Sequence, residues 1–502
     1  MKRLTVGLLL CSATIARGDV TLDAIAPELS VKASLRTRAE AWNWFEPKSG
    51  IENDYVFGAT LGRLALQWKA WRSEVVAEGQ TSSLFGLPDD AVGAPPEGPL
   101  GLGGVYFAHN RAENDASVFL KQAFVLLKDV GQDVGIPGIH VKGGRFEFSE
   151  GSEVPAGGEP TLEWLKKFRI AERLIGPFGW SHVGRAFDGG TASWTTNPEW
   201  CTATWWPTCT ANVTLFGAHP TQGGFDLDGN DEISDVTVGY AAVNLTRPRF
   251  STNTDARLFY VYYADDRELL KVDNRPLPVR QEDLESDITV HGVGGNVQQV
   301  IPTAAGPLDL LAWGLVQTGD WGPLDHSAHA YDFELGFQPA SVAWKPWLRA
   351  GYGRSSGDDD PADGDHGTFF QMLPTARLYS FSTFYNLQNN EDAFFQLILR
   401  PTQQLVSRTD FHVIRVSEGK DLWYQGSGAT LADRDVGFGF PGRPANGRND
   451  LLQILETSLT FDWSANVSAG VYYGHVFGGG VVRSLFGEDD ADFGFLELTL
   501  RL

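Results

Sequence analysis

The charged residues with the clearest chemical potential lie in residues 174–194, LIGPFGWSHVGRAFDGGTASW, a segment rich in glycine and aromatic residues. Within it, Arg185 and Asp188 bring opposite charges close together, and such residues can form a bidentate ion pair. A Gly-Pro pair and a Gly-Gly pair bracket them and predict turns on either side. The segment shows neither a nucleophile next to a base nor the spacing of metal ligands. We therefore interpret it as part of a wall and not as a catalytic loop.

Arginine is used far more often than lysine. It supplies 28 of the 40 basic residues, in a chain whose net charge is −23. A guanidinium group binds carboxylate and phosphate bidentately, so this bias indicates local sites for such anions, with GC-rich codon usage as the alternative explanation. The acidic balance and the lack of a basic tail argue against a nucleic-acid partner. The motifs of serine hydrolases, zinc proteases and P-loop nucleotidases are missing from the sequence, so we expect no enzyme activity.

Several arginines lie in segments with a polar residue at every second position, which is the period of a β-strand. In residues 31–44 this alternation places Arg36 and Arg38 on one face, and in residues 55–71 it places Arg63 opposite a face of leucine and tryptophan. The sequence thus predicts an all-β protein made of many antiparallel strands. The same pattern recurs towards the C-terminus, in residues 331–338, 456–463, 466–474 and 496–502.

Two β architectures share this alternation: a soluble sandwich with its apolar face inside, and an outer-membrane barrel with its apolar face towards lipid. The N-terminus favours the barrel, because Lys2 and Arg3 precede an apolar stretch and a small-residue cleavage site, as in a secretory signal peptide. We therefore expect a signal peptide at 1–18 and a transmembrane barrel at 19–502, in the outer membrane of a Gram-negative type of bacterium. At roughly 25–30 residues per strand and turn, the mature chain makes about 16–18 strands.

Two segments depart from the simple alternation. Residues 160–176 have the spacing of an amphipathic helix, with leucine and phenylalanine three residues apart. The pair Gly143-Gly144 changes the alternation in residues 138–148, which predicts a bulge or a tight turn.

Cysteines and acidic loops are the remaining candidates for bonds or ligands. Cys201 and Cys209 can close a small disulfide loop in an oxidising compartment, or they can remain free thiols. The loops at 223–235 and 357–367 concentrate aspartates, which can bind calcium or simply be solvated. Elsewhere we expect neither a metal nor a cofactor.

Four stretches, spread over the chain, carry a resemblance to a known family. They are GGRFEF at 143–148, ERLIGPFGWSHVGRAFDGG at 172–190, GYGRSSGDDDPADGDHGTFFQMLPT at 351–375 and LWYQGSGAT at 422–430. In these stretches and their order, the chain resembles the bacterial alginate-export family of outer-membrane β-barrels. The tryptophan-rich segment at 201–209 departs from the family's pattern.

The resemblance implies an 18-stranded barrel with an arginine-rich constriction that passes an anionic polysaccharide such as alginate outwards. It also implies partners in a periplasmic secretion complex, beside the lipid of the outer membrane. A diffusion porin for small organic acids or sugars, or a soluble β-fold polyuronate lyase or hydrolase, remains the alternative. For each candidate residue, the alternative is a structural salt bridge in the lumen. The substrate-binding candidates are Arg145, Glu147, Arg185 and Asp188 from the matching motifs, and Arg36, Arg38 and Arg63 from strand alternation alone.

Overall fold

The computed structural model describes most of the chain. It covers residues 20–21, 28–197, 209–228, 230–247, 253–375, 383–426 and 440–502. The predicted signal peptide lies outside these residues and stays a prediction. Cys201 also lies outside them, whereas Cys209 is fully buried and disulfide-bonded.

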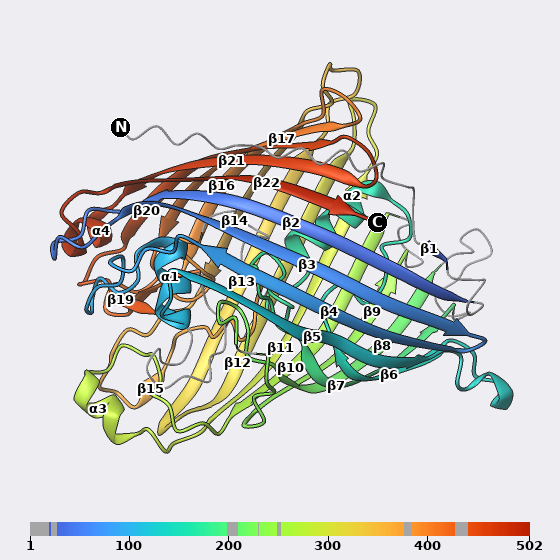
Figure 1. The fold of residues 1–502 in the computed structure, drawn as a ribbon, viewed down its shortest axis with the longest axis horizontal. Helices are drawn as coiled ribbons and strands as arrows, with labels where there is room; N and C mark the ends of the chain where they lie inside the picture. The colour runs from blue at the N-terminus through green and yellow to red at the C-terminus, as the bar shows by residue number, and fades with distance from the viewer. Residues whose placement is uncertain are drawn as a thin grey trace.

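A single closed antiparallel sheet forms the wall of the molecule (Figure 1). The sheet holds 20 strands, of which the two-residue β1 (Val20–Thr21) and β15 (Asp365–His366) only flank the wall. The other eighteen each pair with their neighbours along the barrel, and the last pairs with the first. The predicted 18-stranded barrel is therefore confirmed. The wall strands are β2 (Leu29–Asn43), β3 (Asp54–Ala70), β4 (Ser73–Phe85), β5 (Asn114–Leu127), β6 (Ile139–Phe146), β7 (Phe187–Thr196), β8 (Thr210–Pro220), β9 (Val236–Thr246), β10 (Thr254–Asp265), β11 (Ile288–Ile301), β12 (Leu308–Trp321), β13 (Leu324–Phe337), β14 (Trp347–Ser355), β16 (Glu391–Leu399), β17 (Leu405–Arg415), β20 (Asp450–Asp462), β21 (Val467–Gly478) and β22 (Asp490–Arg501).

The predicted alternation sorts residues between the two faces of this wall. On β13, Asp332 and Glu334 are buried inside the barrel, while Phe333 and Leu335 between them are 57% and 51% exposed on the outside. Successive side chains of a strand point to opposite faces, so an apolar outer surface and a polar inner surface follow directly. Trp71 and Trp463 are exposed in the turns after β3 and β20, where an aromatic girdle is expected.

The two ends of the barrel differ in the length of their connections. The turn between β3 and β4 has two residues, 71–72, and the one between β20 and β21 has four, 463–466. The opposite end carries the long connections 147–186, 356–390 and 416–449. Outer-membrane barrels keep short turns in the periplasm and long loops outside, which orients the chain. The short elements of the connections are α1 (Gly101–Asn110), η1 (Gln132–Val134), α2 (Pro160–Leu165), η2 (Lys166–Ile170), α3 (Leu277–Glu282), α4 (Gly480–Leu485), β18 (Leu422–Tyr424) and β19 (Gly442–Pro444).

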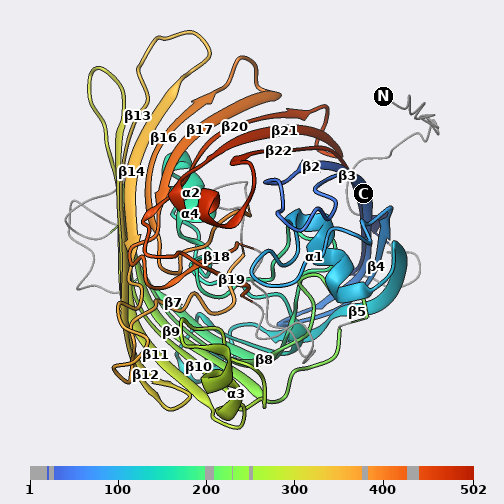
Figure 2. The same ribbon diagram turned by 90° about the vertical axis from the view of Figure 1, so that its left-hand side faces the viewer.

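The long connection 147–186 folds into the barrel, where α2 lies within the ring of strands (Figure 2). The expected helix is present but short, because Ala171 is extended (ψ 144°) and ends it after Ile170. Further along, the amide of Gly176 donates to the carbonyl of Leu373 at 2.9 Å, so two long connections meet inside. Among the described residues, no helix is long and apolar enough to cross a membrane.

Candidate functional site

Five cationic side chains form a group on the inner face, which we call the cationic arc: Arg36, Arg38, Arg63, Lys121 and Arg185. The first three lie on adjacent strands β2 and β3, and Lys121 lies on β5. Arg185 comes from the inward-folded connection, two residues before β7. The arc therefore depends on both strand alternation and the path of one loop.

Carboxylates of the wall neutralise one end of the arc. Arg38 donates from Nε to Glu497 at 2.8 Å and from Nη1 to Glu40 at 3.0 Å. Arg36 instead donates to backbone carbonyls of the inward connection, to Gly179 at 2.9 Å and to Ser181. Its guanidinium thus fastens the connection to the wall while its charge remains only loosely compensated, since Glu497 lies 3.9 Å away.

Arg63 and Lys121 both contact the carboxylate of Glu147, and Arg63 also pairs with Glu78 at 3.6 Å. Arg63 donates to Glu147 at 2.8 Å, and the Lys121 ammonium lies 3.8 Å from the same carboxylate. A β-bulge opposite Glu78 and Gly79 inserts Lys121 into β5 and turns it inwards. Lys121 is fully buried and also donates to the carbonyl of Val183 at 3.3 Å. Two cations therefore face two carboxylates, Glu78 and Glu147, and this part of the arc is nearly balanced in charge.

Arg185 is the least compensated member of the arc. It is 2% exposed, and within the described part of the chain its side chain makes one hydrogen bond, from Nη2 to the carbonyl of Pro374 at 3.1 Å. Its Nε and Nη1 have no partner, and none of the described carboxylates lies within 4.0 Å of it. Burial lowers the pKa of Arg185, but a guanidinium still keeps its proton at neutral pH. Arg185 therefore holds a buried positive charge, compensated by one hydrogen bond and by the ring of Phe178 at 5.3 Å.

Arg145 and Asp188 lie elsewhere. They face each other across β6 and β7, and Arg145 donates to Asp188 at 2.7 Å. Their neighbours Phe146 and Phe187 are fully buried inside, so alternation puts this ion pair on the outer face. The suggested pair of Arg185 with Asp188 is therefore wrong. Gly144 has φ +123°, yet β6 keeps its register with β7, so no inserted residue returns Arg145 to the lumen.

We expect this outer pair to be unimportant for ion selectivity. The double variant Arg145→Gln/Asp188→Asn removes both charges together and leaves neither partner uncompensated. Its reversal potential in a salt gradient should match that of the unmodified protein, whereas Arg63→Gln should shift it towards cations. If the double variant shifts the reversal potential as much as Arg63→Gln does, then Arg145 and Asp188 act on ions in the pore and the prediction is wrong.

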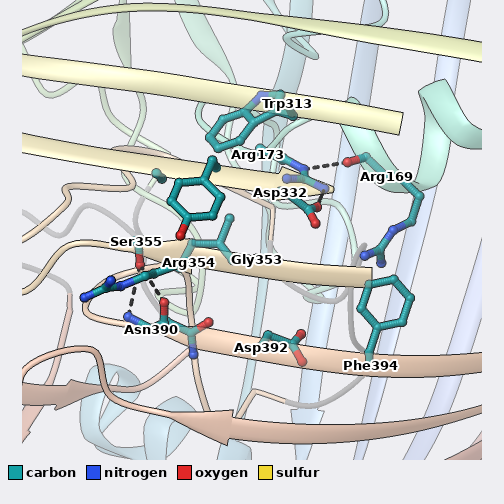
Figure 3. Close-up of a pocket in the computed structure, with 13 residues that line it drawn as sticks. Arg169, Arg173, Trp313, Asp332, Gly353, Arg354, Ser355, Asn390, Asp392 and Phe394 are labelled. Carbon is teal, nitrogen blue, oxygen red and sulfur yellow. Dashed lines mark hydrogen bonds and ion pairs between the residues drawn. The ribbon is translucent and has the colours of Figure 1, made fainter. Parts of the chain in front are cut away.

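A second charged group anchors the inward connection to the opposite wall. Arg169 donates to Glu334 on β13 at 2.7 Å. Arg173 donates to Asp332, beside which it lies in Figure 3. Arg349 on β14 bonds the other oxygen of Glu334 at 2.5 Å. A cavity of about 30 Å³ lies beside Arg169 and Arg173. The helical spacing expected for 160–176 would place residues 169 and 173 on one face, but the helix ends at Ile170 and their partners are far away in the chain.

The acidic loops show local structure. In 357–367, Asp358 accepts from the amides of Asp360 and Gly367, and Asp363 accepts from the amide of Asp365. These carboxylates thus cap turns of their own loop. Calcium binding there stays a prediction.

Together these features define the class of the protein. A closed 18-stranded barrel with an apolar outer face, short turns at one end and charged residues inside is an outer-membrane channel. The model of the alginate-export family matches residues 28–493, so the chain belongs to that family. No curated protein matches the chain.

Solved structures share the fold at low sequence identity. OccAB4 of Acinetobacter baumannii has a TM-score of 0.54 at 8% identity, over 95% of this chain and 98% of its own. OccK9 (OpdG) of Pseudomonas aeruginosa has a TM-score of 0.54 at 10% identity, over 95% and 99%. The outer membrane protein opdK of Pseudomonas aeruginosa has a TM-score of 0.51 at 10% identity, over 94% and 98%. At these identities the likeness shows the fold alone.

Proposed function

We propose that this channel exports an anionic polysaccharide such as alginate through an arginine-lined lumen. The observation that carries the proposal is the cationic arc, above all the buried Arg185, whose charge has no carboxylate partner among the described residues. A polyuronate carries one carboxylate on each sugar, and a guanidinium binds such a group bidentately. Membership of the alginate-export family supports the same class of substrate.

Transport requires that the polymer also leaves. Wall carboxylates already pair with most members of the arc, for example Glu497 with Arg38 and Glu147 with Arg63. A passing carboxylate must compete with these partners, which keeps each contact weak. Several weak sites in a row permit conduction better than one strong site.

Further partners follow from the geometry of the barrel. The exposed leucine, valine and aromatic side chains of the outer face suit contact with membrane lipid. The end with short turns faces the periplasm in this orientation, and proteins of a secretion complex would meet the barrel there. The seven predicted substrate-binding roles stay predictions, and the lumen position of Arg36, Arg38, Arg63, Glu147 and Arg185 supports five of them.

A diffusion porin for small organic acids or sugars is the second candidate, because an 18-stranded barrel with inner arginines also suits small anions. Family and fold point to a transport channel and not to an enzyme, which leaves the soluble lyase or hydrolase without support. Polymer length separates the two channels. A chain of linked uronates can engage several members of the arc at once, whereas a single uronate engages one.

We expect an anion-selective channel that polymannuronate blocks and monomeric mannuronate does not. The purified protein is placed in a planar bilayer, its reversal potential is measured in a salt gradient, and each sugar is added to either side. Neutral dextran of similar length is the control for simple obstruction. Cation selectivity, or equal block by dextran and polymannuronate, would contradict export of an anionic polymer. Block by the monomer at equal carboxylate concentration would favour the porin.

A further inference from the structure

A buried group of three potential metal ligands lies on the inner wall, on strands β17 and β20. Asp410 and Glu456 are direct cross-strand partners, and His412 follows two residues along β17. Each of the three is 1% exposed. One ligand atom from each lies within 4.8 Å of the others. Two carboxylates directly opposite each other in a buried site repel, so a cation bound between them would stabilise the group.

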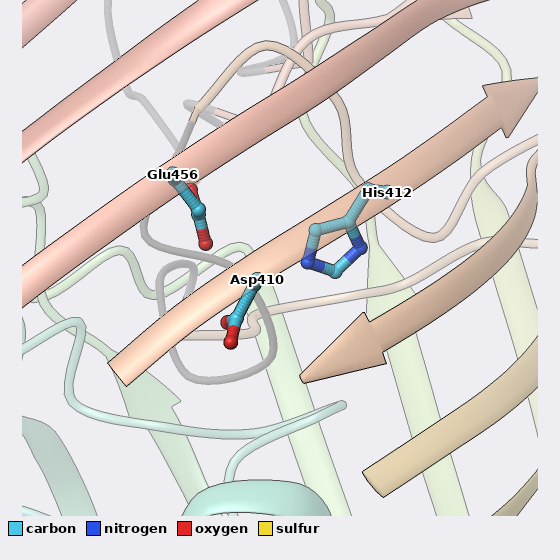
Figure 4. A group of neighbouring side chains, drawn as sticks. All are labelled: Asp410, His412 and Glu456. Atoms are coloured by element: carbon cyan, nitrogen blue, oxygen red, sulfur yellow. The ribbon is translucent and has the colours of Figure 1, made fainter. Parts of the chain in front are cut away.

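The side chains around this group hold its donor atoms in place. Nδ1 of His412 lies 2.9 Å from Asp392 of the next strand, β16, and Asp392 also accepts from Tyr385 at 3.0 Å. This bond directs Nε2 towards the two carboxylates (Figure 4). A carboxylate on the far nitrogen of a histidine is the usual support of a metal-ligating imidazole, because it fixes the ring and raises its basicity.

Two atoms of the group have no hydrogen-bond partner although they are buried. They are Nε2 of His412 and Oδ1 of Asp410. The other oxygen of Asp410 accepts from Arg408 at 2.6 Å and from Gln396 at 3.2 Å. Buried polar atoms normally find a partner, so these two atoms remain available to bind a metal ion.

The group is rich in carboxylates. Asp392, Asp410 and Glu456 surround His412, and Arg408 pairs with Asp410. A metal-ligating histidine must be neutral, so these donors suit a divalent cation.

We propose that Asp410, His412 and Glu456 bind a divalent transition-metal ion, with Zn²⁺ as the best match, and that this ion ties β17 to β20 inside the barrel. One imidazole and two carboxylates suit Zn²⁺, whereas Ca²⁺ takes six to eight oxygen ligands. Ligand atoms about 2.0–2.2 Å from one tetrahedral Zn²⁺ lie roughly 3.3–3.6 Å apart, so side-chain rotations must bring the donor atoms closer than the 4.8 Å within which they now lie. The proposal does not depend on which solute the channel passes.

The test uses the full barrel in detergent after treatment with EDTA. Zn²⁺ is titrated by calorimetry, and Co²⁺ is added as a spectroscopic probe of tetrahedral ligation. We expect one equivalent of Zn²⁺, a higher unfolding temperature with Zn²⁺, and a visible Co²⁺ absorption band. His412→Gln and Glu456→Gln should each weaken Zn²⁺ binding more than tenfold, and Asp392→Asn about 10–100-fold.

His475→Gln is the matched control, because His475 also pairs with an aspartate, Asp492 at 2.8 Å, but lies on the outer face. It should bind Zn²⁺ like the unmodified protein. Heat-dependent migration in gels shows which variants are folded. If a variant does not fold, the unmodified protein still decides: failure to bind one equivalent of Zn²⁺, or no change in its unfolding temperature, overturns the proposal. Equal Zn²⁺ binding in folded His412→Gln, or binding of Ca²⁺ in place of Zn²⁺, overturns it as well.

Discussion

Replacing Arg185 with methionine should weaken the block of the channel by polymannuronate about tenfold, or about 1.4 kcal/mol, and should also make the barrel more stable. Among the residues that the structure describes, the buried guanidinium of Arg185 has only one hydrogen bond and no carboxylate partner, so its burial costs folding free energy. Methionine fills similar space without a charge, and we expect it to raise the free energy of unfolding by about 1–3 kcal/mol. Block is measured in planar bilayers, and stability by urea unfolding in detergent, followed by tryptophan fluorescence.

Arg63→Met provides the matched comparison. Arg63 also belongs to the cationic arc, so its loss should weaken block in the same direction. It pairs with Glu147 and bonds Gln80 at 2.8 Å, however, and its removal leaves that carboxylate with Lys121 alone. We therefore expect Arg63→Met to lower the free energy of unfolding by about 1–3 kcal/mol. If both variants weaken block, but Arg185→Met raises the free energy of unfolding while Arg63→Met lowers it, then Arg185 is retained for function and not for stability. Unchanged block in Arg185→Met would remove it from the substrate path.

The double variant Arg169→Ala/Arg173→Ala should release the inward connection from the wall and raise the single-channel conductance. Both arginines donate hydrogen bonds to carboxylates of β13. The guanidinium of Arg169 also lies over the ring of Phe394 at 4.7 Å, and that of Arg173 over the ring of Trp313 at 5.0 Å. Without them, Asp332 and Glu334 stay buried with fewer cations. Breaking buried pairs of this kind costs about 3–5 kcal/mol, so the unfolding temperature should fall. Single-channel recordings and thermal unfolding measure the two effects.

Arg483→Ala serves as the control for this second experiment. Arg483 also bonds a carboxylate, Asp489 at 2.9 Å, but its side chain is 57% exposed near the rim of the barrel. An exposed pair contributes little, so stability should change by less than about 0.5 kcal/mol and conductance should stay the same. If the double variant has the same single-channel conductance as the unmodified protein, the inward connection at 147–186 does not restrict the width of the pore, and the prediction is wrong.

The architecture was accessible from the sequence because it rests on local patterns. The alternation in residues 31–44 and 331–338 is a period of two, which any strand with one lipid-facing side must show. It placed Arg36, Arg38 and Glu334 on the inner face, where the structure has them. The chain length and the spacing of strands bounded the number of strands, and the resemblance to the alginate-export family gave eighteen.

The positions of the charges were accessible only in part. Counting residues could not show that Gly144 at φ +123° keeps the register of β6, so the outward position of Arg145 was hidden. Arg185 lies outside the strands, where no periodicity fixes the direction of a side chain. Its lack of a carboxylate partner depends on how the connection 147–186 meets Pro374 and the wall.

The sequence by itself determined the wall, that is, its strands and the polar and apolar faces of each. The alternation of polar and apolar residues is a property of neighbouring positions, so it can be read from the sequence. A strand shifted by one residue would turn its apolar side chains away from lipid, which fixes which face each residue occupies. Only the tertiary structure decided which charges meet. Asp410 and Glu456 are 46 residues apart and become direct partners because β17 pairs with β20 in one register. Arg173 finds Asp332 across the lumen for the same reason: contacts between distant residues depend on closure of the whole barrel.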